Sequence, residues 1–388
     1  MTALPFTRKD ITLANWREAP FHKWSFHNVS EFVPTAAITT GDEAVGDSPG
    51  SEPLEGMMLT RPDGTEVSAS DHMALSHGDC FIALRNGQIL AEWNAPHGST
   101  VRPHLIFSIS KSVTGMLAGI AVGDGRLDPA APVSRYVAVP AGSAYETATV
   151  RDLLDMTVSL DFVEDYLDHE GDFDRYRRST LWNPERPGTR LETMEEVLVS
   201  LPRLPGPHGK VFAYASPNTD MLGIVVERAT GVRLHDYLRD RLWQPMGGRG
   251  PAYVTVDRVG AARAAGGMCV TARDLARLGQ LVLDGGRRGD AQIIPAGWID
   301  DMRRNGARQA WIDGNFAATF PDGRYRSCWY QLGTPRDHFA GEGIHGQRLL
   351  VDPVSRVVIV KFSTVPLPSD DAATVLDFAM LSQIAAKL

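Results

Sequence analysis

Residues 107–116 have the sequence FSISKSVTGM, and they decide the fold of this chain. The stretch places Ser108 and Lys111 at the start of a predicted helix, because Ile109 and Val113 recur at helical spacing. Residues three apart on a helix share a face, so the Ser108 hydroxyl and the Lys111 amine should lie side by side. A lysine in a dry site can lose its proton and activate a serine as a nucleophile. On this motif alone, a solvated serine and lysine remain the alternative.

Two later motifs carry candidate chemistry. Tyr214 stands in the sequence FAYASPN (212–218), just before a predicted helix, where a phenol can relay a proton to a leaving group. A half-buried core tyrosine is the alternative. Residues 341–347, GEGIHGQ, should open a strand, and their glycines would let backbone N–H groups approach a ligand as an oxyanion hole. A simple turn is the alternative there.

Length and composition limit the class of protein. The chain has 388 residues, of which 43% are hydrophobic, so it can bury a core in one large or two interleaved domains. The net charge is −8 and the basic residues are scattered, so a nucleic acid is not an expected partner. No apolar run is long enough for a membrane span, and the first residues lack the apolar segment of a signal peptide.

Cysteine and histidine usage predicts a reduced, metal-free protein. Cys80, Cys269 and Cys328 lie far apart in the sequence, which is typical of buried thiols in a cytoplasmic protein. The eleven histidines show no metal-ligand spacing, so neither a metal nor another cofactor is expected.

Turn and cap residues predict the other elements. Asn86-Gly87 should join two strands in a hairpin over residues 80–93. Ser216 should cap a helix that runs to Thr230 and ends at Gly231. Further helices are predicted at 150–156, 192–201, 234–242, 271–284 and 370–388, and further strands at 266–269, 329–332, 346–351 and 357–363.

A second candidate nucleophile lies in the acidic loop 41–56. There Gly46-Asp47-Ser48-Pro49-Gly50 matches the G-x-S-x-G pattern of a nucleophile elbow. An elbow needs a buried strand before it and a helix after it, and neither is predicted here. We therefore do not expect Ser48 to act as the nucleophile.

The predicted elements give an α/β (α+β) fold in which strands flank a helical middle. Residues 1–72 should form an N-terminal extension that packs on the body. Residues 73–105 and 266–388 should combine into one sheet domain with helices, and residues 106–265 should form a mainly helical domain. That helical domain would carry Ser108, Lys111 and Tyr214.

The order of these motifs resembles the serine β-lactamase and DD-peptidase superfamily. Within it, the chain most resembles the 6-aminohexanoate-dimer hydrolases, or nylon-oligomer hydrolases, which are related to class C β-lactamases and family VIII carboxylesterases. The resemblance runs from about residue 16 to 364 and is carried by the stretches WREAPFHKWSF, FSISKSVTG, LDFVEDYLD, FAYASPNTD, GGMCVTARDLARLG, TFPDG and GIHGQRLLVDP.

The resemblance implies a role for each matching residue. Ser108 would be the nucleophile, Lys111 its base, and Tyr214 the group that protonates the leaving amine or alkoxide with the help of the lysine. The backbone N–H groups of Ser108 and Ile344 would form the oxyanion hole. Tyr166 would lie on a mobile segment that closes over substrate, and His345 is included among the substrate-binding residues. The implied fold is an antiparallel sheet flanked by helices, joined to a helical domain, with the site in the cleft between them.

The expected function is therefore hydrolysis of small amides or esters through an acyl-enzyme. A β-lactamase or D-amino-acid peptidase is the alternative, but Gly341 begins the third motif where the penicillin-binding relatives carry Lys-Thr-Gly or His-x-Gly. The tyrosine motif is also Tyr-Ala-Ser and not Tyr-x-Asn. A non-catalytic sensor is a second alternative, although a scaffold has no need of all three catalytic side chains. No glutamate acting through a water is expected. The partners expected are a small substrate and, as one option, a second copy of the chain.

Charge specificity is predicted at Arg177. In the nylon-dimer hydrolases an aspartate shortly after the mobile tyrosine receives the substrate's ammonium group, and a gap-free alignment of residues 164–182 places Arg177 there. A guanidinium would repel an ammonium and suits a carboxylate. The sequence thus predicts poor activity on the linear aminohexanoate dimer and better activity on neutral or acid-bearing substrates. Pairing of Arg177 with Glu170, Asp172 or Asp174 at the surface is the alternative.

Overall fold

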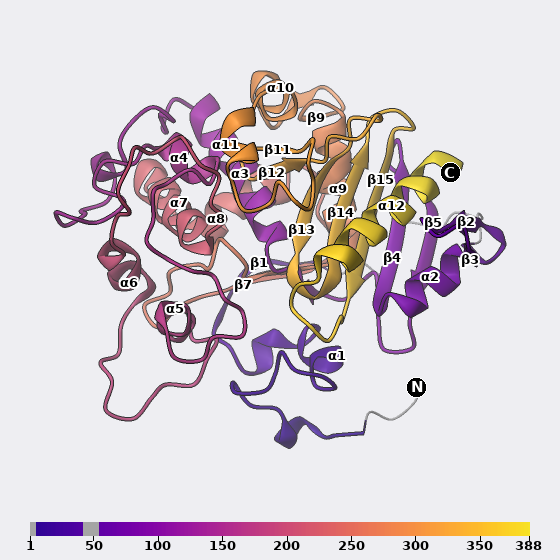
Figure 1. The fold of residues 1–388 in the computed structure, drawn as a ribbon, viewed down its shortest axis with the longest axis horizontal. Coiled ribbons are helices and arrows are strands. Elements are labelled where there is room, and N and C mark those ends of the chain that lie inside the picture. The colour runs from indigo at the N-terminus through magenta and orange to yellow at the C-terminus, as the bar shows by residue number, and fades with distance from the viewer. Residues whose placement is uncertain (1–4, 42–53) are drawn as a thin grey trace.

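One antiparallel sheet of seven strands forms one side of the molecule (Figure 1). This computed structural model describes residues 5–41 and 54–388. Across the sheet the strands follow the order β11 (Arg324–Arg326), β12 (Trp329–Gln331), β13 (Phe339–Gly343), β14 (Gln347–Asp352), β15 (Val357–Ser363), β4 (Gly78–Arg85) and β5 (Gln88–Asn94). Early and late parts of the chain therefore share one sheet, as predicted, and β15 joins them by pairing with β4.

The centre of this sheet is buried because helices cover both of its faces. Helix α9 (Ala272–Leu283) packs on one face, and α2 (Ala69–Leu75) and α12 (Asp371–Lys387) pack on the other (Figure 1). All residues of β15 are buried, which explains the continuous apolar run in its sequence. The predicted β4–β5 hairpin is confirmed: Asn86 and Gly87 take φ values of 51° and 77°, as a two-residue turn of this kind requires.

A group of helices lies beside the sheet (Figure 1). The helices of the remaining chain are α1 (His22–Ser25), α3 (Ile109–Gly123), α4 (Val150–Leu154), α5 (Asp172–Ser179), α6 (Met194–Ser200), α7 (Ser216–Thr230), α8 (Leu234–Leu238), α10 (Ala296–Arg304) and α11 (Arg308–Ile312). Helix α3 packs against both α7 and the sheet strand β13, so it stands at the junction of the two parts.

The predicted cap of α7 is wrong at its start and correct at its end. Gly231 ends the helix with a φ of 71°, but the N-cap position belongs to Ala215, and Ser216 is the first helical residue. The Ser216 hydroxyl donates to Glu164 and accepts from Lys111, so it does not cap the helix. A tertiary contact has replaced the local cap that the sequence pattern favoured.

A second, four-stranded sheet supports the start of α3. It consists of β1 (Thr35–Thr40), β7 (Pro251–Thr255), β8 (Met268–Val270) and β6 (His104–Leu105). Strand β7 lies within the segment that was expected to be mainly helical, and β1 joins it from the N-terminal segment. The division into domains stays a prediction. The elbow pattern at Ser48 lies outside the described residues.

The N-terminal segment packs directly behind the nucleophile. Trp16 and Phe26 are fully buried in one cluster with Phe107 and Trp182. The Trp16 indole donates to the Trp182 carbonyl oxygen at 3.0 Å. In the described part of the chain, no helix is long and apolar enough to cross a membrane.

Close packing of α3 gives a test of the fold. A Cβ on Gly115 would lie 2.2 Å from the Ser327 carbonyl oxygen, in the turn between β11 and β12. We expect Gly115→Ala to lower the free energy of unfolding by about 1–3 kcal/mol in chemical denaturation. Gly297→Ala on α10 is the control, because a Cβ there meets no heavy atom within 4 Å. That variant should be as stable as the wild type or up to about 1 kcal/mol more stable. Equal stability of both variants would contradict the close contact.

Candidate active site

Ser108 and Lys111 lie one turn apart at the start of α3, as the sequence predicts. The Lys111 Nζ atom is 2.9 Å from Ser108 Oγ, 3.0 Å from Ser216 Oγ and 2.8 Å from the Ala265 carbonyl oxygen. The lysine side chain is almost fully buried. Burial lowers the pKa of Lys111 from 10.5 to about 8, against the opposing charges of Glu164 and Asp220. A lysine of this kind is partly unprotonated near neutral pH and can act as a base.

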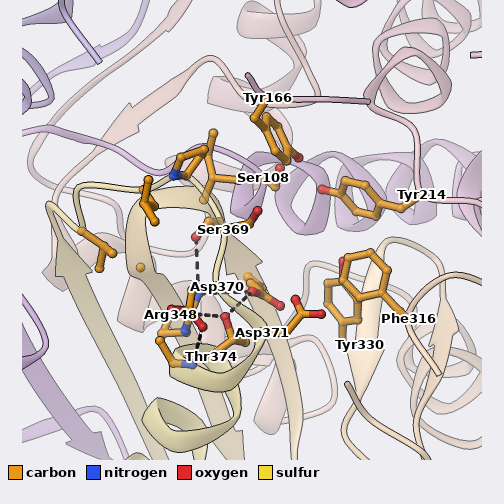
Figure 2. A pocket seen from close by; sticks show the side chains of 18 residues that line it. Ser108, Tyr166, Tyr214, Phe316, Tyr330, Arg348, Ser369, Asp370, Asp371 and Thr374 are labelled. Carbon is orange, nitrogen blue, oxygen red and sulfur yellow. Dashed lines mark hydrogen bonds and ion pairs between the residues drawn. The ribbon is translucent and has the colours of Figure 1, made fainter. Parts of the chain in front are cut away.

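Tyr214 lies close to the serine, with its hydroxyl end toward Ser108 (Figure 2). Its ring centroid is 4.9 Å from Lys111 Nζ, and the ring packs on Phe316. Burial and the charge of Glu164 hold the pKa of the Tyr214 phenol well above 10, although the Ser108 hydroxyl opposes this shift. The phenol therefore stays protonated and can donate to a leaving group.

The glycine-rich motif brings Ile344 to the same place. Ser108, Gly343 and Ile344 all line a cavity of about 80 Å³. The motif opens strand β14, which begins at Gln347, as predicted, and its first residues, up to Gly343, also complete strand β13. A Cβ on Gly343 would lie 2.6 Å from the Ile106 carbonyl oxygen, so only glycine lets β13 come this close to the chain before Ser108. An oxyanion hole formed by the amides of Ser108 and Ile344 stays a prediction.

Glu164 joins the tyrosine segment to the lysine, a role that the sequence did not reveal. Its Oε1 atom accepts from the Tyr166 hydroxyl at 2.7 Å and from the Ser216 hydroxyl at 2.8 Å. Its Oε2 atom accepts from the Ser216 amide at 2.5 Å. The first amides of a helix need an acceptor, and Ala215 offers no side chain for this purpose. The sequence pattern assigned this role to Ser216, and nothing in it identified the distant glutamate that accepts from the first amide.

Arg177 lines a second cavity, of about 460 Å³, and Tyr166 also forms part of its wall. We call it the arginine chamber, because Arg17 and Arg177 both line it. The alternative of surface pairing is wrong, since Arg177 is buried. Its nearest acidic neighbour on α5, Asp174, forms its ion pairs with Arg178 and Arg186 at 2.9 and 3.1 Å.

His345 also lines the arginine chamber, but its imidazole has structural partners. The Nδ1 atom is 2.8 Å from the Val365 carbonyl oxygen, and the ring centroid is 5.3 Å from that of Phe107. Burial lowers the pKa of His345 to about 3, so the ring is neutral at physiological pH. Its role in substrate binding stays a prediction.

One buried group of metal-ligand type exists in the described residues, formed by His27, Asp79 and His104. His104 Nε2 is 3.1 Å from an Asp79 carboxylate oxygen, and its Nδ1 atom is 2.8 Å from the Leu105 carbonyl oxygen. The Asp79 carboxylate also accepts from His97 and from the Thr364 hydroxyl, each at 2.8 Å, so its oxygens are already engaged in hydrogen bonds. These contacts fit a buried hydrogen-bonded pair better than a metal site.

Comparison with known proteins places the chain among hydrolases. The β-lactamase family model matches residues 74–382. The chain is 38% identical over 357 residues to a 6-aminohexanoate-dimer hydrolase of Paenarthrobacter ureafaciens, which covers 92% of this chain and 89% of that protein.

Solved structures share the fold. A candidate 6-aminohexanoate-dimer hydrolase from Bacillus anthracis superposes with a TM-score of 0.88 at 23% identity, covering 98% of each chain. A family VIII carboxylesterase gives a TM-score of 0.55 at 15% identity, covering 81% of this chain and 95% of the other. The predicted combination of an antiparallel sheet and helices is thereby confirmed.

The contact between Glu164 and Ser216 predicts a pH effect. Ser108 should react with a fluorophosphonate faster as the pH rises, with a midpoint near the Lys111 pKa of about 8. The negative charge of Glu164 raises that pKa, so Glu164→Gln should move the midpoint to lower pH. Tyr166→Phe is the control, because it removes the hydroxyl and keeps the carboxylate, and its midpoint should not move. The labelling rate against pH checks this, and an unchanged midpoint in Glu164→Gln would contradict it.

Proposed function

The chain belongs to the β-lactamase family and is a serine hydrolase of amides or esters, and we propose that its acyl-enzyme forms on Ser108. The observation that carries this proposal is the 2.9 Å contact between Lys111 Nζ and Ser108 Oγ, in a site where the lysine is buried. A base with a lowered pKa beside a hydroxyl is the arrangement that serine activation requires.

Acylation follows from these positions. Lys111 takes the proton of Ser108 while Oγ attacks the substrate carbonyl carbon, and the amides of Ser108 and Ile344 hold the resulting oxyanion. Tyr214 gives its proton to the leaving nitrogen or oxygen and recovers one from Lys111, so the acyl–nitrogen or acyl–oxygen bond breaks. A water molecule then attacks the ester on Ser108 and releases the acid.

The substrate proposed is a small amide or carboxylic ester. The curated relative's name describes hydrolysis of a 6-aminohexanoate dimer, which is a linear amide. A dedicated β-lactamase is less favoured, because Gly341 begins the third motif where the penicillin-binding relatives carry a lysine or a histidine. A cation at that position would attract the carboxylate of a penicillin.

Two finer expectations remain proposals that rest on the sequence. The first is a cytoplasmic location, supported by three free and buried cysteines. The second is that a homodimer is one option for the assembly. The catalytic alternative is favoured over a sensor because Ser108 and Tyr214 line one cavity and Lys111 contacts both of them from the buried side.

Covalent labelling tests the nucleophile. We expect a fluorophosphonate to add one label to the wild-type chain and none to Ser108→Ala, measured by intact mass with peptide mapping. The label should lie on the peptide that contains Ser108, because Ser108 lines the cavity and has Lys111 Nζ 2.9 Å from its Oγ. The Ser216 hydroxyl also lies beside Lys111, but it is buried and donates to Glu164. A label on any other serine, Ser48 included, would refute the assignment.

Leaving-group chemistry separates Tyr214 from Lys111. Lys111→Ala should lower kcat/KM by roughly 10²–10⁴-fold on every substrate, because the nucleophile loses its base. Tyr214→Phe should affect anilides and alkyl amides far more than nitrophenyl esters, whose leaving group needs no proton. Steady-state kinetics on a nitrophenyl ester and the matching anilide checks both expectations. Equal losses for Tyr214→Phe on the two substrates would argue against its role as the proton donor.

A further inference from the structure

The arginine chamber adjoins the cavity at Ser108. Tyr166, Leu367 and Pro368 line both spaces, so the chamber begins where the Ser108 cavity ends. At about 460 Å³ it is much larger than the cavity of about 80 Å³ at the nucleophile, and it has room for a substrate chain. The proposed mechanism uses no residue of the chamber except Tyr166.

Of the three arginines that line the chamber, Arg186 pairs with Asp174, whereas Arg17 and Arg177 lack acidic partners. Arg177 donates from Nη1 to the Tyr166 carbonyl oxygen at 3.0 Å, and its guanidinium lies 4.1 Å from the Phe173 ring centroid. Arg17 donates to the Trp182 carbonyl oxygen at 2.9 Å and to the Asn183 side-chain oxygen at 2.5 Å. Among residues 5–41 and 54–388, neither arginine forms an ion pair.

The acids around the chamber do not neutralise this pair. Asp174 is paired with Arg178 and Arg186, and Glu185 is paired with Arg258. Glu18 also lines the chamber, but it is exposed. Arg177 is buried and Arg17 is half-buried. Cations that face a cavity without a counterion favour an anionic ligand.

The charges of the arginines act on each other. Burial lowers the pKa of Arg177 to about 10, and the charge of Arg263 adds to this effect. Burial and the charge of Arg177 hold the pKa of Arg17 well below 12.5. Repulsion between like charges costs free energy that a bound anion would recover.

The chamber and the surroundings of the proposed proton donor are lined by different residues. Tyr214, the proposed donor to the leaving group, lines the Ser108 cavity with Phe316 and Tyr330, and none of these three residues lines the chamber. Tyr166 separates the two regions, and Figure 2 shows it on a different side of Ser108 from Phe316 and Tyr330. A chain that extends from the scissile carbonyl away from the leaving group therefore leads toward Arg177.

We infer that Arg17 and Arg177 bind a carboxylate at the far end of the substrate's acyl chain. The preferred substrates are then half-esters or half-amides of dicarboxylic acids, and an acyl chain that ends in an ammonium is disfavoured. The planar guanidinium fork matches a carboxylate by paired hydrogen bonds, whereas two cations repel an ammonium. This inference rests on the proposed function, because it assigns the acyl half of the substrate cleaved at Ser108.

Three nitrophenyl esters test the inference. Their six-carbon acyl chains are identical except for the end group, which is a carboxylate, a methyl or an ammonium. The wild type should show a kcat/KM for the carboxylate ester roughly 10- to 100-fold above that for the ammonium ester, as expected for a charge-assisted hydrogen bond of about 1.5–3 kcal/mol. The kcat/KM for the nitrophenyl ester whose acyl chain ends in a methyl group should lie between these two values.

Substitutions of Arg17 and Arg177 test whether these residues cause the charge preference. Arg177→Met and Arg17→Met should each reduce the ratio of carboxylate to ammonium kcat/KM by about tenfold, and the double variant should abolish it. Arg175→Met is the matched control, because Arg175 lies on α5 with Arg177 and pairs with Glu192, and neither Arg175 nor Glu192 lines the chamber. Its ratio should equal that of the wild type. Because the readout is a ratio, a general loss of activity does not change the conclusion.

A second measurement needs no variant. Adipate should slow fluorophosphonate labelling of wild-type Ser108 at lower concentration than hexanoate or 6-aminohexanoate does. The inference is overturned if the wild type shows no charge preference, if the preference survives in the double variant, or if adipate protects no better than hexanoate. Failure of the proposed function would give a different result. In that case Ser108 would not be labelled, or Ser108→Ala would still hydrolyse the nitrophenyl ester whose acyl chain ends in a methyl group.

Discussion

The structure depends on burying the Lys111 amine while keeping it hydrogen-bonded. A buried amine without partners costs several kcal/mol, so each of its contacts must be supplied by the fold. Here the acceptors are Ser108 Oγ, Ser216 Oγ and the Ala265 carbonyl oxygen. They come from the start of α3, the start of α7 and the segment before β8. One lysine thus fixes the relative positions of three distant segments, and that arrangement creates the cavity at the nucleophile.

Tyr166 lies between an acidic residue, Glu164, and a basic residue, Arg177. On the lysine side, Glu164 binds the Ser216 hydroxyl and raises the pKa of Lys111, which burial lowers. On the chamber side, Arg177 binds the Tyr166 carbonyl oxygen, while the Tyr166 hydroxyl binds Glu164. The same tyrosine therefore touches the acid that tunes the base and the cation that we assign to the substrate. Movement of its segment would change both surroundings at once.

The N-terminal segment is part of the site as well as of the core. Trp16 packs edge-on against Trp182 with ring centroids 5.2 Å apart, and the next residue, Arg17, points its guanidinium to the Trp182 carbonyl oxygen. In Figure 1 this indigo segment lies beneath α5, the helix that carries Arg177. The same aromatic packing that holds the segment in place therefore also positions Arg17 at the wall of the arginine chamber.

The sequence by itself determined the features that depend on neighbours in the chain. The helical spacing after Ser108, the Asn86-Gly87 turn and Gly231 at the end of α7 are local patterns, so they identified the Ser108–Lys111 pair, the hairpin and the helix boundary. Only the tertiary structure decided that Ser216 faces Lys111 instead of capping its helix, that Glu164 meets the amide of Ser216, and that Arg17 joins Arg177. The partners in these contacts lie between 52 and 160 residues apart, and no periodicity or cap rule links residues at such distances. Their choice follows from which buried polar groups the packed core leaves without a partner, and that is settled only when the chain has folded.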